Sequence, residues 1–291
     1  MDNQVERVYL NGKMVIASEA SISVFDYNFL FGYGLFETMH AYNGVIFRLK
    51  NHIDRLMNSA IKLKISIDPD SLIKAVSTVL EANRLSEARV RLVVTPGTGK
   101  LVPDISSCRQ PIILAIATRH IPHSIEIYNK GYRVIIASNC RNTHSAVAGI
   151  KVTGYLENIL ARQEARSRGA DDAILFNEEG NLAEASMSNV FMVKNNVLFT
   201  PPLSAGILPG ITRDVVLELA PACGIKTIVK DIHLPQLMEA DEIFLTASML
   251  EIMPVTVIED RQIGSGKPGT VTRELTRAYK ELVQKETAGE G

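Results

Sequence analysis

The sequence is poor in cysteine and has no long apolar run. Its three cysteines, Cys108, Cys140 and Cys223, are far apart and odd in number. They predict neither a disulfide framework nor a zinc site, and a reduced cytoplasmic compartment is expected. No run of 18 apolar residues occurs, so no membrane span is expected. The charged start MDNQVERVYLNGK lacks the apolar centre of a signal peptide.

The sequence also lacks an excess of charge of either sign. Its 31 Lys and Arg residues nearly balance its 32 Asp and Glu residues, which gives a net charge of −1. Because a nucleic-acid backbone requires a basic protein surface, nucleic acid is not expected as a main partner. The hydrophobic share of 46% is ordinary for a globular protein that buries a core.

The first 118 residues mix expected strands with expected helices. Two Asn-Gly pairs, at 11–12 and 43–44, lie between strand-like segments and are strong signals of hairpin turns. Apolar periodicity predicts helices over about 50–63 and 70–83. The segments ARVRLVV and PIILAIA, which follow the helices, read as strands.

The remainder of the chain repeats this mixture after a break. The segment 119–131 fits neither a helix nor a strand and is expected to be a linker. Beyond it, strands are expected at YRVIIAS, DAILFN, NVFMVK, VLFT, EIFLTAS and IMPVTVI, with helices after Lys151, at GITRDVVLELA and over about 270–284. We therefore predict an α+β protein with an N-terminal domain over 1–118, a linker over 119–131 and a larger domain over 132–291.

Lys151 follows an apolar segment and precedes a predicted helix. The expected apolar face of that helix comprises Tyr155, Leu156, Ile159, Leu160 and Ala165. A lysine in apolar surroundings is costly unless it is paired or its charged form is disfavoured. By itself this position fits a lysine that extends its charge to solvent as well as one with a chemical role.

Two further segments carry groups suited to chemistry. Glu184 stands between alanines in NLAEASMSN, and by itself it also fits a solvated residue at a strand end. In GILPGITRD, Gly206 and Gly210 precede a helix that opens at Ile211 and Thr212. A helix N-terminus offers N–H groups and partial positive charge to a phosphate, although Thr212 also fits a plain N-cap.

A lysine, a carboxylate and a phosphate-binding helix start together suit pyridoxal 5′-phosphate. A lysine amine forms an imine with the cofactor's aldehyde. A carboxylate keeps a proton on the pyridine nitrogen, so the ring accepts negative charge.

Four long segments in order resemble the fold-type IV, or class IV, pyridoxal-phosphate aminotransferases. They are FGYGLFETMHAYNGVIFRLKNHIDRL, IKVTGYLENILARQEARSRGADDAILFNEEGNLAEASMSNVF, LFTPPLSAGILPGITRD and EIFLTASMLEIMPV. The resemblance spans almost the whole chain. It implies an α+β, two-domain fold with a small α/β N-terminal domain and a larger C-terminal pseudo-barrel domain. It also implies bound pyridoxal 5′-phosphate, amino acid and 2-oxo acid substrates, and a homodimer.

The resemblance assigns roles to matching residues. Lys151 matches the Schiff-base lysine, Glu184 the partner of the pyridine nitrogen, and Arg55 a phosphate arginine, which is a bidentate donor. The other cofactor-binding matches are Tyr155, Leu208, Ile211, Thr212, Ser248 and Met249. The expected substrate-binding residues are Phe31, Phe36 and Arg91. No metal ligand is implied.

The motifs leave the substrate open. GITR, Tyr155 and Arg91 favour a branched-chain amino acid aminotransferase of branched-chain amino acid biosynthesis, acting on L-amino acids and 2-oxoglutarate. However, Phe31 replaces a tyrosine common in that subgroup, VTGY is one residue shorter than AGGNY, and AEASMSN replaces SEGSGEN. FGYGLFET also resembles aminodeoxychorismate lyases, which release pyruvate. D-amino acid or amine transaminases remain an alternative, although GTGKLVPD lacks their Arg-x-His pair. A non-enzymatic protein that binds the cofactor is a further alternative.

Overall fold

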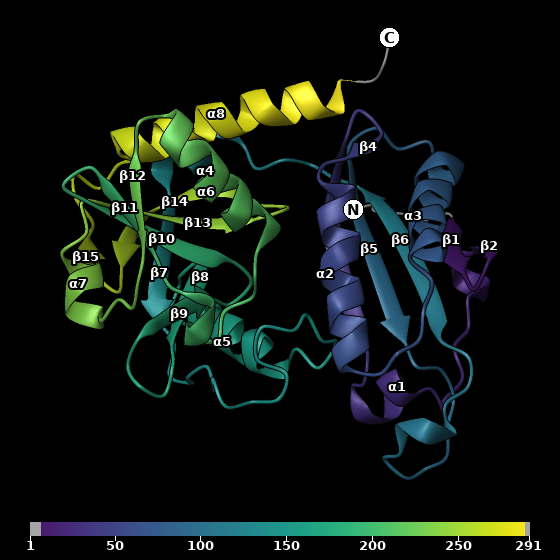
Figure 1. Cartoon of the computed structure of the whole chain (residues 1–291). Helices are drawn as coiled ribbons and strands as arrows, with labels where there is room; N and C mark the ends of the chain where they lie inside the picture. Colours follow the sequence, from purple (N-terminus) through teal and green to yellow (C-terminus); the bar gives the residue numbers. More distant parts are fainter. Residues whose placement is uncertain (1–6, 289–291) are drawn as a thin grey trace. The chain divides into compact units, whose positions relative to one another are not determined.

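A computed structural model describes residues 7–288, and the chain divides into two compact units (Figure 1). The first unit comprises Met1–Ile121, Ile150–Gly154 and Val283–Gly291, and the second comprises Pro122–Gly149 and Tyr155–Leu282. The chain passes between them within the segment 119–131, where a linker was expected. The expectation that 132–291 forms a single domain differs from this division, because the five residues around Lys151 pack with the first unit.

The first unit is built on a six-stranded sheet within the described residues. Its strand order is β2-β1-β6-β5-β3-β4, and the neighbours pair antiparallel. The strands are β1 (Arg7–Leu10), β2 (Lys13–Ile16), β3 (Leu35–Tyr42), β4 (Val45–Ile46), β5 (Ala88–Thr95) and β6 (Ile112–Arg119). Both predicted hairpins are confirmed: β1 pairs with β2 and β3 with β4, and Asn11, Gly12, Asn43 and Gly44 all have positive φ, as such two-residue turns require.

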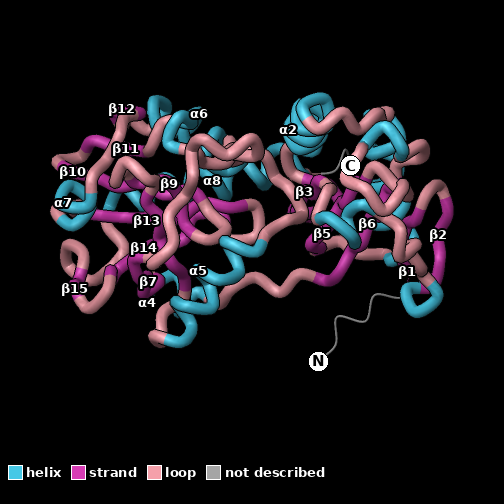
Figure 2. The backbone as a smooth tube through the Cα atoms, turned by 90° about the horizontal axis from the view of Figure 1, so that it is seen from below, coloured by secondary structure: helices cyan, strands magenta, loops and turns pink. Residues whose placement is uncertain are grey.

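Two long helices, α2 (Leu49–Lys62) and α3 (Pro69–Asn83), cover one face of this sheet (Figure 2). The strands alternate accordingly. On β5, Val90 and Leu92 are buried in the core beneath the helices, whereas Arg89 and Arg91 lie on the opposite face. A short helix, α1 (Tyr27–Phe31), precedes β3, and its N-cap Asp26 accepts a hydrogen bond from the Asn28 N–H.

The second unit contains a nine-stranded, barrel-like sheet. Its strands are β7 (Tyr132–Ile136), β8 (Asp172–Phe176), β9 (Leu182–Ala185), β10 (Asn189–Lys194), β11 (Val197–Thr200), β12 (Lys226–Val229), β13 (Glu242–Ala247), β14 (Glu251–Ile258) and β15 (Arg261–Gln262). Strands β10, β13, β14, β7, β8 and β9 pair in that order, and β9 pairs back to β10 through Glu184 and Asn189. This last pairing closes the ring of strands at one of the predicted site residues.

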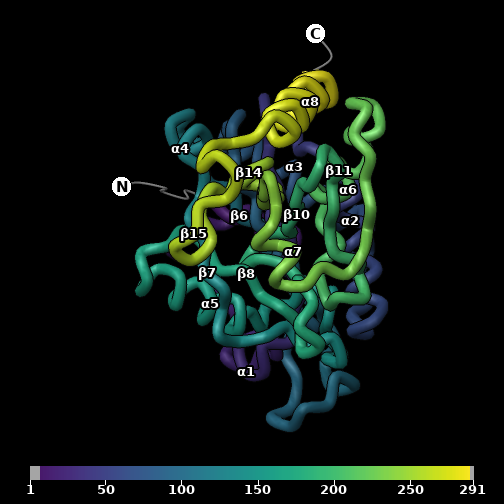
Figure 3. The backbone as a smooth tube through the Cα atoms, turned by 90° about the vertical axis from the view of Figure 1, so that its left-hand side faces the viewer, coloured from purple at the N-terminus to yellow at the C-terminus, as the bar shows by residue number. Residues whose placement is uncertain are grey.

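The helices of the second unit are α4 (Ile125–Lys130), α5 (Leu156–Ser167), α6 (Ile211–Ala222), α7 (Leu234–Met238) and most of α8 (Thr270–Thr287). Helix α4 lies in the segment that was expected to contain no helix. In Figure 3 this unit faces the viewer, and α5 lies next to β8. No helix among residues 7–288 is both long and apolar enough to cross a membrane.

The predicted apolar face of α5 is wrong in one respect. Ala161 and Ala165 are buried, but Leu156, Ile159 and Leu160 are 66%, 49% and 51% exposed. The large apolar side chains of the predicted face are thus exposed, and α5 buries Asn158, Ala161 and Ala165 instead.

Candidate active site

Lys151 is attached to the first unit by the start of β3. Its carbonyl oxygen accepts a hydrogen bond from the Phe36 N–H at 3.0 Å, and Val152 forms a bridge with Leu35. Lys151 is half-buried rather than buried. Its Nζ lies 4.6 Å from the centre of the Phe36 ring, so the predicted cofactor lysine contacts a predicted substrate residue.

Arg91 contacts the same ring. Its Cζ lies 3.5 Å from the centre of the Phe36 ring, and Nη1 donates a hydrogen bond to Thr38 Oγ1 at 3.3 Å. Thr38 and Arg91 face each other across the β3–β5 pairing. Lys151 and Arg91 therefore both contact the Phe36 ring, on the sheet face opposite α2 and α3. Phe31, at the end of α1, is 44% exposed and packs edge-on against Tyr27 at 5.0 Å.

Arg55 belongs to a buried cluster between β3 and α2. Glu37 has no exposed surface, and Arg55 donates from Nε to Glu37 Oε1 at 2.8 Å and from Nη2 to Oε2 at 2.6 Å. His52 Nδ1 lies 2.8 Å from Oε2. The predicted phosphate arginine thus uses its Nε–Nη2 edge, the edge suited to a bidentate contact, on a carboxylate of its own chain.

The charges in this cluster follow from burial and proximity. Burial alone would raise the pKa of Glu37, but the Arg55 charge and the His52 hydrogen bond outweigh it and hold that pKa far below its usual range. Burial lowers the pKa of His52, Glu37 opposes this, and the Arg55 and Lys151 charges add to the lowering. Near neutral pH we therefore assign an ionised Glu37 and a neutral His52 whose Nδ1–H donates to it.

Glu184 is held in the second unit by two other segments. Its Oε2 accepts a hydrogen bond from the Leu208 N–H at 3.0 Å, and its Oε1 lies 3.0 Å from Arg141 Nη2. Asn189, which pairs with Glu184 across the barrel closure, donates from its side chain to the Leu208 carbonyl at 2.9 Å. Glu184, Leu208 and Asn189 therefore form a closed ring of contacts.

Helix α6 begins next to this ring. Its N-cap is Gly210, which provides no side-chain hydrogen bond, and Ile211 and Thr212 are buried in its first turn. The plain N-cap role for Thr212 is therefore excluded. A Cβ atom at Gly210 would lie 1.9 Å from Asn189 Oδ1, so only glycine lets the start of the helix approach Asn189 this closely.

Two hydroxyl groups near the helix start have no hydrogen-bond partner among the described residues. They are Ser188 Oγ, next to Asn189 in the chain, and Thr246 Oγ1, on the residue paired with Asn189 across β10 and β13. A buried polar group without a partner is rare in folded proteins and requires an explanation. A polar ligand at this end of α6 would provide one, so the local chemistry fits a phosphate group.

The other predicted residues of the second unit occupy turns and helix ends. Ser248 and Met249 are half-buried in the turn that joins β13 to β14, beyond Thr246. Tyr155 is the half-buried N-cap residue of α5. Their roles toward a cofactor remain predictions.

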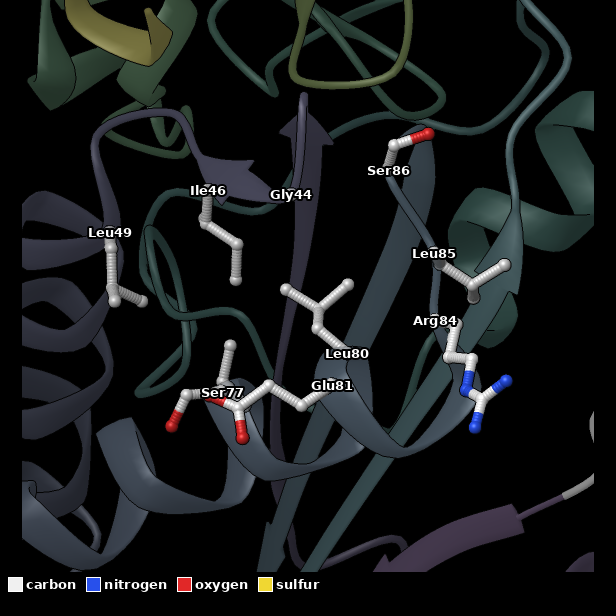
Figure 4. A pocket seen from close by; sticks show the side chains of 10 residues that line it. Gly44, Ile46, Leu49, Ser77, Leu80, Glu81, Arg84, Leu85 and Ser86 are labelled. Atoms are coloured by element: carbon white, nitrogen blue, oxygen red, sulfur yellow. The ribbon is translucent and has the colours of Figure 1, made fainter. Parts of the chain in front are cut away.

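The first unit contains a pocket of about 390 Å³ (Figure 4). It is lined by Gly44, Ile46, Leu49, Val76, Ser77, Leu80, Glu81, Arg84, Leu85 and Ser86. None of these is a predicted site residue, and the lining includes no lysine that could carry the cofactor.

Comparison with known proteins decides the family. The model of the family described as amino-transferase class IV matches residues 34–258. The chain belongs to the class IV aminotransferases. It is therefore a pyridoxal-phosphate enzyme, and the predicted cofactor, family and fold type IV are confirmed.

Individual class IV proteins match over nearly their whole length. A putative branched-chain-amino-acid aminotransferase of Methanocaldococcus jannaschii is 40% identical over 279 residues, which covers 95% of this chain and 96% of the relative. An aminodeoxychorismate lyase of Bacillus subtilis is 32% identical and covers 95% and 94%. A branched-chain amino acid aminotransferase from T.th., solved with pyridoxamine 5′-phosphate, superposes with a TM-score of 0.93 at 32% identity and covers 98% and 97%.

Sequence reasoning missed Glu37, His52, Arg141 and Asn189. Strand and helix spacing contain a signal for two of them. Glu37 lies on the same face of β3 as the buried Leu35 and Met39, and His52 lies three residues before Arg55 on α2. Arg141 lies in an irregular loop, where no periodicity identifies it.

Proposed function

We propose that this class IV aminotransferase transfers the amino group of L-branched-chain amino acids to 2-oxoglutarate, with Lys151 as the residue that carries the cofactor. The observation that carries the proposal is the shared contact of Lys151 and Arg91 with the Phe36 ring, at 4.6 and 3.5 Å. A cation beside the reactive amine suits a substrate that carries a carboxylate. The 40% identical relative named a putative branched-chain-amino-acid aminotransferase supports the substrate class.

Each unit carries groups of defined chemistry. Pyridoxal phosphate supplies an aldehyde to the lysine and a ring that accepts negative charge. In the first unit, Lys151 Nζ would take the proton from the substrate's α carbon and pass it on to the cofactor, and Arg55, oriented by Glu37, would bind phosphate oxygen. In the second unit, Glu184 would hold the proton on the pyridine nitrogen, and the N–H groups of the first turn of α6 and the Thr212 hydroxyl would bind phosphate.

We also propose a homodimer. The apolar stripe of Leu156, Ile159 and Leu160 on α5 is exposed in the single chain. In the first unit Phe25 and Phe29 are 49% and 72% exposed. Exposed apolar groups of this size commonly belong to interfaces, and a second copy of the chain is the occupant expected of this family. Sedimentation of the purified protein should give twice the chain mass, and a monomer would contradict the proposal.

A substrate panel tests the reaction. The protein loaded with cofactor is incubated with single L- and D-amino acids plus 2-oxoglutarate, and glutamate is measured. Glutamate from L-leucine, L-isoleucine and L-valine, with no reaction of their D-forms, supports the proposal. Activity restricted to D-amino acids would overturn it.

A matched pair of arginine variants tests the role of Arg91. Arg91→Ala should raise the KM for 2-oxoglutarate roughly tenfold to a hundredfold, because a hydrogen bond to a charged group contributes about 1.5–3 kcal/mol. Arg89→Ala is the control, since Arg89 lies on the same face of β5 and is exposed. Equal effects of the two substitutions would show that Arg91 has no special contact with substrate.

Aminodeoxychorismate lyase is the second candidate. The segment FGYGLFET and the 32% identical lyase of Bacillus subtilis favour it. Pyruvate released from aminodeoxychorismate, with no glutamate from the L-amino acids, would establish the lyase and replace the transaminase proposal.

A further inference from the structure

Arg141 contacts Glu184 but is no part of the assigned site. Arg141 lies beside the end of β8. Its N–H donates to the Phe176 carbonyl at 2.8 Å, and the residue forms a β-bridge with Asn177. Its Cγ would lie 3.1 Å from a Cβ atom at Gly206, so its side chain packs on the Gly206 backbone. The bridge therefore holds the backbone of Arg141, and the ion pair with Glu184 holds its guanidinium.

The pair of Arg141 and Glu184 is shielded from water. The two side chains are only 14% and 11% exposed, and Nη2 lies 3.0 Å from Oε1. Arg141 Nη1 lies 3.6 Å from Glu157, whose side chain is 62% exposed and therefore screened. Arg141 Nε is buried without a hydrogen-bond partner among the described residues. Placing an arginine here carries an energetic cost, and the close contact with Glu184 is its main compensation.

Resting on the proposed function, we propose that Arg141 is a positioning residue that keeps Glu184 ionised and fixes its carboxylate, so that the proton shared with the pyridine nitrogen stays on the ring. Burial disfavours the charged form of a carboxylate, and a neighbouring cation favours it. Arginine remains protonated at all accessible pH values. The Leu208 N–H on Oε2 and Arg141 on Oε1 approach from different segments, so together they set the carboxylate plane.

A coupled set of variants tests the proposal. The set is Arg141→Met, Arg141→Lys, Glu184→Gln and the double variant, with Arg168→Met as control, since Arg168 is an exposed arginine of the same unit that pairs with other carboxylates. A neighbouring opposite charge changes the proton affinity of a carboxylate by about tenfold to a thousandfold. Arg141→Met should therefore slow conversion of the bound cofactor by the best amino donor at least about tenfold. Arg141→Lys should restore much of the rate, and Arg168→Met should stay within about twofold of wild type.

A second readout separates positioning from simple support of the fold. The visible absorption of the bound cofactor depends on the protonation of its ring. Arg141→Met should displace the pH at which this absorption changes, and Arg141→Lys should move it back toward wild type. A variant that only loosens the fold would lower cofactor occupancy without displacing that pH.

The double variant gives the decisive comparison. Because glutamine carries no charge for Arg141 to balance, Arg141→Met should slow Glu184→Gln by less than about threefold. If the two single losses multiply in the double variant, or if Arg141→Met alone leaves rate and spectrum unchanged, the inference is overturned. If Glu184→Gln itself is fully active, the proposed role of Glu184 fails instead. Should Arg141→Met not fold, Arg141→Gln, which keeps N–H donors without charge, takes its place in the same comparison.

Discussion

Each unit buries a glutamate against an arginine, and the two pairs differ in what accompanies them. Glu37 receives side-chain donors at both oxygens, from Arg55 and His52, on a fully buried sheet face. Glu184 receives one arginine and one backbone N–H at the closure of the barrel. In the first unit the carboxylate orients the arginine, and in the second unit the arginine supports the carboxylate. Under the proposed function, a similar ion pair would support phosphate binding in the first unit and would hold a proton on the cofactor ring in the second.

The largest expected effect on stability comes from Glu37→Gln. Removing one partner of a buried ion pair leaves an uncompensated charge and costs about 3–5 kcal/mol. The free energy of unfolding of the protein without cofactor should fall by that amount in a denaturant titration. A loss below about 1 kcal/mol would mean that Glu37 and Arg55 behave like a surface pair, and the contrast with Glu184 would lose its basis.

The complementary substitution, Glu184→Gln, should act on chemistry rather than on folding. Glutamine has nearly the same shape, so the protein should still bind its cofactor. Loss of one key electrostatic group costs about 2–4 kcal/mol of transition-state stabilisation, which corresponds to a rate about thirtyfold to a thousandfold lower. Single-turnover conversion by the best amino donor measures it, and a rate within a few-fold of wild type would remove Glu184 from the proposed role.

Arg55→Ala should weaken cofactor binding more than it slows chemistry at saturating cofactor. A hydrogen bond to a charged group contributes about 1.5–3 kcal/mol, so the Kd should rise roughly tenfold to a hundredfold. Titration of the cofactor-free protein measures the change. Unaltered affinity would indicate that Arg55 hydrogen-bonds only to Glu37 and that other groups bind the phosphate.

The sequence predicts most of the fold because periodic segments report burial directly. The Asn-Gly hairpins, the two long helices of the first unit and six of the nine barrel strands follow from local pattern, whereas α1 and the short strands β9, β12 and β15 do not. The short helix α4 is not predicted, because six residues give too little periodicity to identify a helix. The exposure of the apolar stripe on α5 is not predicted, because periodicity identifies an apolar face without identifying what covers it.

The candidate site is less accessible from sequence. Local pattern singles out Lys151 and Glu184, the family resemblance adds Arg55 and assigns all three roles, and these roles remain predictions. Glu37 and His52 follow strand and helix spacing, but Arg141 and Asn189 come from distant segments and follow no spacing rule. Arg141 is 43 residues before Glu184 in the chain, and only the folded barrel brings them together.

The smallest expected effect concerns pH. Because burial lowers the pKa of His52, its neutral form contributes stability above the unfolded value of about pH 6.5, and this contribution is lost as pH falls toward the lower folded pKa. His52→Gln should therefore lose less stability than wild type between about pH 7 and 5, by at most about 1.4 kcal/mol per pH unit. Thermal unfolding of the two proteins across that range measures the difference, and parallel curves would show that the pKa of His52 is the same in the folded and unfolded states, which contradicts the prediction.

The central claim is that Lys151 carries the cofactor, and chemical trapping tests it most directly. Borohydride reduction of the loaded protein should fix the cofactor to its lysine permanently, and peptide mass spectrometry then locates the attachment. We predict the modification on the peptide that contains Lys151, and none in a Lys151→Ala variant treated in the same way. Attachment at another lysine in the wild-type protein, or an unmodified Lys151 in a fully loaded sample, would contradict the account.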